Sequence, residues 1–195
     1  MPLHFAAEPA NGSSLVHKGL SKVATRTSPL TARGVDLTSP QLSPPHAVFD
    51  LRADVVARGG GLESATATGF RYLVQAGGAN IAAGEVLTDS NGVASLLANI
   101  NYGPFVEATA QALTEVAKLP AVGAGSFEAR LLRFSAIALM ALWLKSDSGD
   151  GDFVYPLAPA PPSLEAGGPY TAGEFIQIIR PLAQARAERH GPSVP

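Results

Sequence analysis

The chain contains no cysteine. This absence excludes disulfide bonds, thiolate catalysis and cysteine-ligated metal sites. The four histidines lie at positions 4, 17, 46 and 190, outside the segments that are expected to form the core. None of them stands in a pattern of acidic residues that is typical of a metal site, and we expect no metal and no cofactor.

Charged residues are also scarce. They make up 15% of the chain, well below the roughly 25% of an average soluble protein. A surface with few charges favours a protein partner, a homo-oligomer or a ligand, although Ser, Thr and Gly in loops could also cover it. The net charge of −2 at pH 7 argues against nucleic acid as a partner, because nucleic-acid binders usually display a basic face.

The sequence has no long hydrophobic run. The most apolar one, Phe134–Leu144, is shorter than the about 20 residues that cross a bilayer. The N-terminal residues 1–7 lack both the charged part and the long apolar part of a signal peptide. We therefore expect no membrane segment, a cytoplasmic protein, and a core that is centred on Phe134–Leu144.

Residues 1–45 are predicted to be a flexible leader. They are rich in Ser, Thr, Pro, Gly and Ala and hold only scattered Leu and Val, so they offer too little apolar area to offset the entropy of ordering. A short amphipathic docking peptide over 15–23 is the alternative to an inert tail. Pro44-Pro45 favours extended backbone, and a single α+β domain, residues 46–195, is predicted to follow it.

An antiparallel meander and a helix are expected in the first half of this domain. Strands are predicted wherever β-branched and aromatic residues stand between turn signals, at 47–51, 70–75, 80–87 and 93–100. The Gly77-Gly78 turn between two of them is typical of a hairpin. Proline is well placed at the first helical position, and Pro104 therefore predicts a helix that ends near Leu119.

The second half is expected to contain a long hairpin. Residues 127–131 alternate as in a half-buried strand, and the change of phase at Leu131-Leu132 predicts a bulge. Residues 135–144 suit either a strand or a buried helix, but the turn at 146–151 and the strand-like segment after it favour a hairpin. Pro156 should lie at an edge or a strand end, because it has no N–H for the ladder.

A C-terminal helix is predicted from Thr171, which forms a capping box with Glu174. An apolar stripe with helical spacing follows, at Phe175, Ile178, Ile179 and Leu182. Pro181 predicts a kink or break near Ile178. The predicted fold class is α+β: an antiparallel sheet, made of a meander plus a long hairpin, is packed by two helices and preceded by a disordered N-terminal leader.

No catalytic residue is assigned. The glycines at 59–61 lack the Gly-Lys-Ser/Thr ending of a phosphate loop, and the sequence has no Gly-x-Ser-x-Gly elbow. Asp147, Asp150 and Asp152 depart from the spacing of a calcium loop. We interpret these three aspartates as a solvated hairpin tip.

Two groups of residues are candidates for a functional site. The first group is charged and lies on predicted strands, where cross-strand ion pairs are the simplest explanation. If one face of the sheet is a pocket, these residues bind the ligand: Arg71, Glu85, Arg130 and Arg133. The second group consists of apolar side chains that are candidates for an interface: Trp143, Tyr155 and Ile176.

The preferred function is that of a non-enzymatic accessory or assembly protein, which acts through protein–protein interaction. The alternative is a small-molecule binding domain or an enzyme with a cleft between the sheet and the helix that starts at Pro104. A cleft lined by Arg71, Glu85 and Arg133 would favour the alternative. A flat apolar patch would favour assembly.

Overall fold

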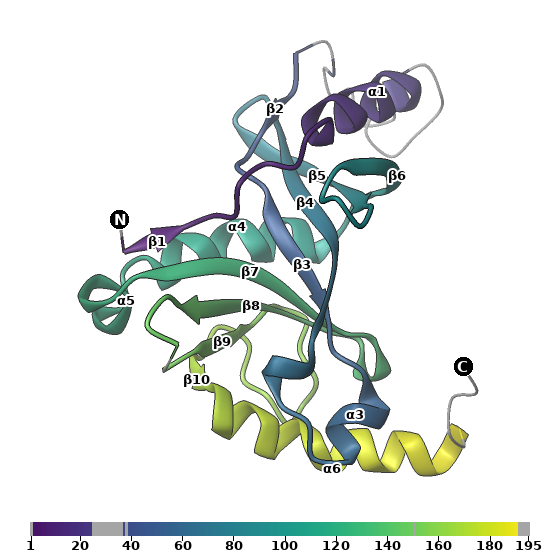
Figure 1. The fold of residues 1–195 in the computed structure, drawn as a ribbon. Coiled ribbons are helices and arrows are strands. Elements are labelled where there is room, and N and C mark those ends of the chain that lie inside the picture. Colours follow the sequence, from purple (N-terminus) through teal and green to yellow (C-terminus); the bar gives the residue numbers. More distant parts are fainter. Residues whose placement is uncertain (1, 25–36, 38, 150, 191–195) are drawn as a thin grey trace.

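The computed structural model describes residues 2–24, 37, 39–149 and 151–190, and these form a mixed sheet with helices on both faces (Figure 1). The strands are β1 (Leu3–His4), β2 (Gln41–Leu42), β3 (His46–Asp50), β4 (Thr66–Ala76), β5 (Ala79–Thr88), β6 (Ala94–Asn101), β7 (Phe127–Phe134), β8 (Leu139–Ser146), β9 (Phe153–Pro156) and β10 (Tyr170–Thr171). The helices are α1 (Gly12–Ala24), α3 (Ala53–Ala57), α4 (Pro104–Val116), α5 (Pro120–Ala124) and α6 (Ala172–His190). Two short 3-10 turns are η1 (Leu62–Ser64) and η2 (Ser135–Ile137).

The order of the strands is β10-β9-β8-β7-β3-β4-β5-β6, while β1 pairs with β7 and β2 pairs with β4. The α+β class is confirmed. The sheet was predicted to be antiparallel, but it is mixed. Strand β3 lies between the meander and the hairpin and runs parallel to β7, with Ala47 beside Arg130. Strand β1 is also parallel to β7. The two predicted parts of the sheet are therefore joined by a strand that precedes both of them.

The predicted meander and hairpin are both present. Strands β4, β5 and β6 pair antiparallel in sequence order, and so do β7, β8 and β9. Residues 135–144 were predicted as a strand or a buried helix. The structure has the short η2 turn first and then strand β8 from Leu139 onward. Pro156 is the last residue of β9, as its missing N–H predicts.

The predicted bulge at Leu131-Leu132 is absent. The β7–β8 ladder runs without a shift from the Phe127–Ser146 pair to the Phe134–Leu139 pair. Both leucines are almost fully buried because helices cover both faces of the sheet at this point. A strand that is buried on both faces loses the alternation on which the prediction of a bulge depended.

Each face of the hairpin half has its own core. Helices α6 and α3 cover one face, where Phe175 and Ile179 pack with Leu132 and Phe134 (Figure 1). Helix α4, confirmed where Pro104 predicted it, covers the other face together with α5. There its buried residues Ala112 and Val116 pack with Leu131 and Leu142 of the sheet.

Helix α6 begins with the predicted capping box. The Thr171 amide donates to Glu174 Oε2 at 2.9 Å, and the Glu174 amide donates to Thr171 Oγ1 at 3.3 Å. The helix continues through Pro181 as one element, so the predicted break near Ile178 is not found. Among the described residues, no helix is both long enough and apolar enough to cross a membrane.

The prediction of a flexible leader over 1–45 is wrong for residues 2–24. Helix α1 buries Val16 and Leu20 completely or nearly so, and both pack against Tyr72, Val74 and other residues of the meander. Gly84 makes room for the helix, because a Cβ at this position would lie 2.6 Å from Val16 Cγ1. The part of the prediction that concerns 25–36 and 38 lies outside the described residues.

Candidate functional site

A chain of alternating charges crosses the face of the sheet that carries α4. Arg71 Nη1 donates to Glu85 Oε1 at 3.0 Å, and Arg133 Nη1 donates to Glu85 Oε2 at 2.8 Å. Arg133 Nε donates to Asp50 Oδ1 at 2.7 Å. The strand register brings these groups together, because Arg71 lies opposite Glu85 and Asp50 lies opposite Arg133.

Burial makes this chain of charges a structural element. Arg71 and Glu85 are 1% and 5% exposed, so neither charge would be tolerated without its partner. Burial lowers the pKa of Arg71, and the carboxylate of Glu85 opposes this effect. Burial also acts against the charge of Arg133, but Asp50 and Glu85 outweigh it and raise the pKa of Arg133. The cross-strand ion pair that the sequence predicted is confirmed for Arg71 and Glu85.

Arg130 lies on the opposite face, away from the other three predicted ligand-binding residues. Its guanidinium donates to both carboxylate oxygens of Glu128, at 2.8 and 3.4 Å. The same group lies over the rings of Phe49 and Trp143, 4.6 and 5.0 Å from their centroids. The two rings contact each other edge to face. Arg130 therefore belongs to a stack of planar groups that spans β3, β7 and β8.

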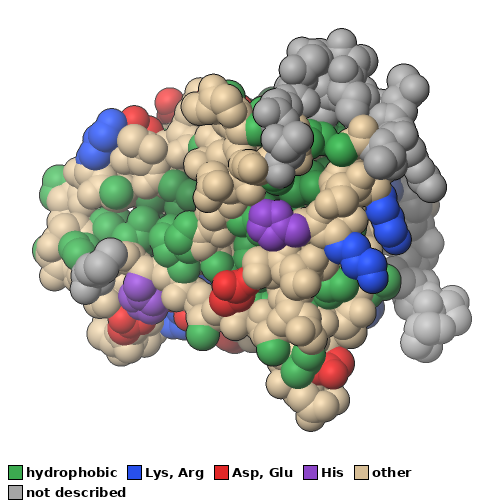
Figure 2. Space-filling model, turned by 90° about the horizontal axis from the view of Figure 1, so that it is seen from above, with side chains coloured by type: hydrophobic (Ala, Val, Ile, Leu, Met, Phe, Trp, Pro, Cys, Tyr) green, Lys and Arg blue, Asp and Glu red, His purple; other side chains and the backbone are tan. Residues whose placement is uncertain are grey.

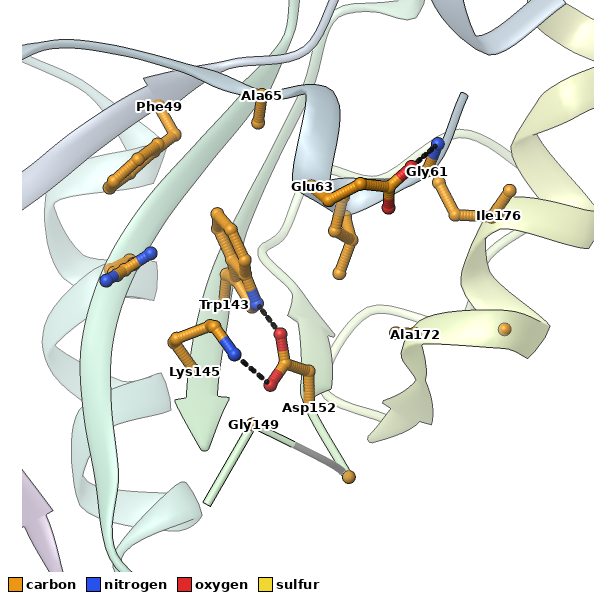
Figure 3. Close-up of a pocket in the computed structure, with 14 residues that line it drawn as sticks. Phe49, Gly61, Glu63, Ala65, Trp143, Lys145, Gly149, Asp152, Ala172 and Ile176 are labelled. Carbon is orange, nitrogen blue, oxygen red and sulfur yellow. Dashed lines mark hydrogen bonds and ion pairs between the residues drawn. The ribbon is translucent and has the colours of Figure 1, made fainter. Parts of the chain in front are cut away.

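This stack lines an open cleft of about 570 Å³, which we call the α6 cleft (Figure 3). One wall is the sheet, with Phe49, Arg130, Trp143 and Lys145. The opposite wall comes from η1 and from the start of α6, and it includes Glu63, Ala65, Ala172, Gly173 and Ile176. The sequence predictions contain Arg130, Trp143 and Ile176, but they assign them to two different kinds of site.

The polar groups of the α6 cleft are bonded to one another. The Asp152 carboxylate accepts hydrogen bonds from Trp143 Nε1 at 2.8 Å, from Lys145 Nζ at 3.2 Å and from the Ser146 amide at 2.9 Å (Figure 3). Glu63 Oε1 accepts from the Gly61 amide at 2.8 Å. Asp152 was interpreted as part of a solvated hairpin tip. The predicted hairpin, which brings the residues just before β9 close to the end of β8, was the one sequence signal for this contact.

The three predicted interface residues are mostly buried. Trp143 and Ile176 are 4% and 7% exposed and pack in the core between the sheet and α6, but both also line the α6 cleft. Tyr155 is 8% exposed and lines a smaller cleft of about 210 Å³ between α4 and β9. This smaller cleft matches the position of the predicted cleft beside α4. Its lining contains Gln111 and Glu115 but none of the predicted ligand-binding residues.

His4 has an acidic partner that is distant in the sequence, Asp147. Its Nε2 lies 3.0 Å from Asp147 Oδ2, and Ser126 Oγ donates to the same oxygen at 2.6 Å. These two contacts, first the serine and then the histidine, lower the pKa of Asp147. The carboxylate stands between the other two groups, so the serine donates to the acid and not to the imidazole. This order does not activate a serine nucleophile, which needs the histidine in the middle.

No family model, no curated protein and no solved structure matches this chain. The function is therefore argued from the geometry of the described residues.

Proposed function

We propose that the protein is a non-enzymatic interaction protein, and that the α6 cleft holds a segment of a protein partner. The observation that carries this proposal is the stack of Phe49, Arg130 and Trp143 along one wall of an open cleft. Tryptophan and arginine are the residues that most often dominate binding energy at protein interfaces, and they do so in pockets at the centre of the contact.

The stack is held in place before any partner arrives. Glu128 orients the guanidinium of Arg130, and Asp152 fixes the indole N–H of Trp143. Side chains that are already ordered lose little entropy on binding. Binding of a partner in the cleft therefore does not cost the entropy of ordering these side chains.

The chemistry of the cleft favours an apolar guest. Asp152, Lys145 and Glu63 are bonded to neighbours, so a polar ligand would have to replace contacts that already exist. Phe49, Ala65 and other apolar groups remain available along the walls. Charged residues are few in the chain as a whole. Figure 2 views the molecule from the side away from α6 and shows hydrophobic side chains gathered on the half of that face that lies away from the grey residues. An apolar side chain of a protein partner fits these conditions.

Binding of a small molecule is the second candidate function. A cleft between α4 and β9 supports this candidate, and Tyr155 and Gln111 offer polar groups there. Its volume of about 210 Å³ is below the range of about 300 to 1,000 Å³ that is typical of ligand pockets. The smaller cleft therefore carries no proposal.

A bulky residue at Gly173 tests the proposal without disturbing the core. Gly173 lines the α6 cleft, is exposed, and a Cβ at this position meets no atom within 4 Å. Gly173→Phe should fill the cleft and abolish capture of the partner from cell extract by the tagged protein, as measured by quantitative mass spectrometry. Gln177→Phe is the matched control, because Gln177 is exposed on the same helix outside the lining of the cleft.

Two results would contradict the proposal. One is a wild-type protein that captures no partner. The other is a partner that Gly173→Phe and Gln177→Phe retain equally well, which would place the contact elsewhere on the surface.

A further inference from the structure

Arg130 uses only part of its guanidinium within the described part of the chain. Its Nε and Nη2 donate to the two carboxylate oxygens of Glu128, at 2.8 and 3.4 Å. Its Nη1 donates to no described residue and is not among the buried atoms that lack a partner. The side chain is 20% exposed and lines the α6 cleft. The two N–H groups of Nη1 are therefore open to a guest.

Arg133, three residues further along β7 and on the opposite face of the sheet, shows what such a guanidinium can bind. Its Nε and Nη2 donate to the carboxylate of Asp50, at 2.7 and 3.2 Å. Its Nη1 donates to a second carboxylate, that of Glu85, at 2.8 Å. Arg130 repeats the first of these contacts with Glu128, and a second carboxylate would complete the pattern at Nη1.

Lys145 stands beside Arg130 on the same wall of the cleft. In the β7–β8 ladder it lies opposite Glu128, so Lys145 and Arg130 are diagonal neighbours on one face of the sheet. Lys145 Nζ donates to Asp152 Oδ1 at 3.2 Å and to the Ser146 carbonyl oxygen at 3.3 Å (Figure 3). One of its three N–H groups is left over. A carboxylate in the cleft can therefore accept from both side chains without displacing an existing hydrogen bond.

We propose that the partner segment in the α6 cleft places an apolar side chain against Phe49 and Ala65, and the carboxylate of an Asp or Glu against Arg130 Nη1. This inference rests on the proposed function and adds the chemistry of the guest. The Arg130 guanidinium lies 4.6 Å from the centroid of the Phe49 ring. The acidic residue must therefore be close to the apolar one in sequence, since side chains two residues apart on one side of an extended segment are about 7 Å apart.

The hydrogen bonds of the cleft favour an acidic guest over a basic one. Asp152 already accepts three hydrogen bonds, and Glu63 accepts from the Gly61 amide. The carboxylates of the lining are therefore engaged, whereas Arg130 and Lys145 retain donors. An open cleft admits a segment that continues on both sides, which favours a side chain over the end of a chain as the source of the carboxylate.

Selection from a random peptide library tests this inference. Peptides whose C-termini are fused to a phage coat protein have no free terminal carboxylate, so only acidic side chains can supply one. The full-length tagged protein should select peptides with an Asp or Glu within two residues of a large apolar residue, and Gly173→Phe should bind none of them. Selected peptides that lack the acidic residue would overturn the inference while the proposed function stands. A library that yields no peptide lost on Gly173→Phe would overturn the proposed function as well.

A double-mutant cycle on one selected peptide tests the contact itself. Arg130→Gln should weaken binding about tenfold in fluorescence polarisation, and so should replacement of the acidic residue of the peptide by its amide. The two changes together should weaken binding little more than either alone. Arg130→Lys keeps a charge for Glu128 but has no Nη1, so it should keep the wild-type circular dichroism and bind nearly as weakly as Arg130→Gln.

Arg189→Gln is the matched control for the cycle. Arg189 is exposed near the end of α6 and lies outside the lining of the cleft, so this variant should bind the peptide with unchanged affinity. Effects of Arg130→Gln and of the peptide amide that simply multiply in the combined measurement would show two independent changes and would overturn the contact.

Discussion

His46 shows how one buried residue couples the fold to pH. Its side chain is 1% exposed, and its Nδ1 lies 3.3 Å from the carbonyl oxygen of Arg71. Its Nε2 has no hydrogen-bond partner among the described residues, and Phe5 packs edge to face on the ring. Burial, aided by the charge of Arg71, lowers the pKa of His46 to about 4.

This lowered pKa predicts a loss of stability in mild acid. Unfolded chains bind the histidine proton below the ordinary histidine pKa of 6.5, whereas the folded chain does so only near pH 4. The free energy of unfolding should therefore be constant above about pH 6.5 and fall by about 3 kcal/mol as the pH drops toward 4.

Urea unfolding of the wild type and of His46→Gln at several pH values measures this effect. The variant should lack the part of the slope that lies between pH 6.5 and 4, while both proteins share the contribution of their carboxylates. Parallel pH profiles for the two proteins would show that His46 is accessible to solvent.

The ion pair of Arg71 and Glu85 could be predicted from the sequence, but the extension of the chain of charges to Asp50 could not. Arg71 and Glu85 stand on strands that a Gly-Gly turn connects, so their contact follows from local pattern. The contact between Asp50 and Arg133 depends on the parallel pairing of β3 with β7. Nothing in the sequence near either residue indicates that pairing, and the extension of the chain of charges to Asp50 was therefore missed.

Helix α1 shows where composition misleads at the scale of an element. Residues 1–45 have the composition of a disordered segment, but Val16 and Leu20 are four residues apart and face the same side of a helix. These two side chains can hold the helix against the sheet because Gly84 lets Val16 approach the strand closely. The capping box of α6 and Pro104 of α4 were predicted because their signals are local.

The packing of α1 predicts a clear difference between two adjacent residues. Val16→Ala should lower the free energy of unfolding by about 2 kcal/mol, because it removes a fully buried branched side chain. His17→Ala changes an exposed position of the same helix and should stay within about 0.5 kcal/mol of the wild type. Equal effects of the two substitutions in urea unfolding would support the flexible leader in place of the packed helix.

At the scale of the whole molecule, strand pairs could be predicted when the two strands are close in the sequence, but not when they are far apart. The meander and the hairpin join neighbouring segments, and both were predicted from turns and strand patterns. The parallel β3–β7 pair joins Ala47 to Arg130, and no local signal marks it. The α6 cleft depends on this pair, because it is what places Phe49 of β3 beside Trp143 of β8. The sequence could therefore name Arg130 and Trp143 but not the site that they share.

The most direct test of the proposed function follows the indole of Trp143 itself. Trp143 is the only tryptophan of the chain and lines the α6 cleft, so incorporation of 5-fluorotryptophan places one fluorine signal at the site. Addition of the captured partner should shift or broaden this resonance in the wild type and in Gln177→Phe, but not in Gly173→Phe. A partner that binds the wild type while the Trp143 resonance stays unchanged would contradict the account.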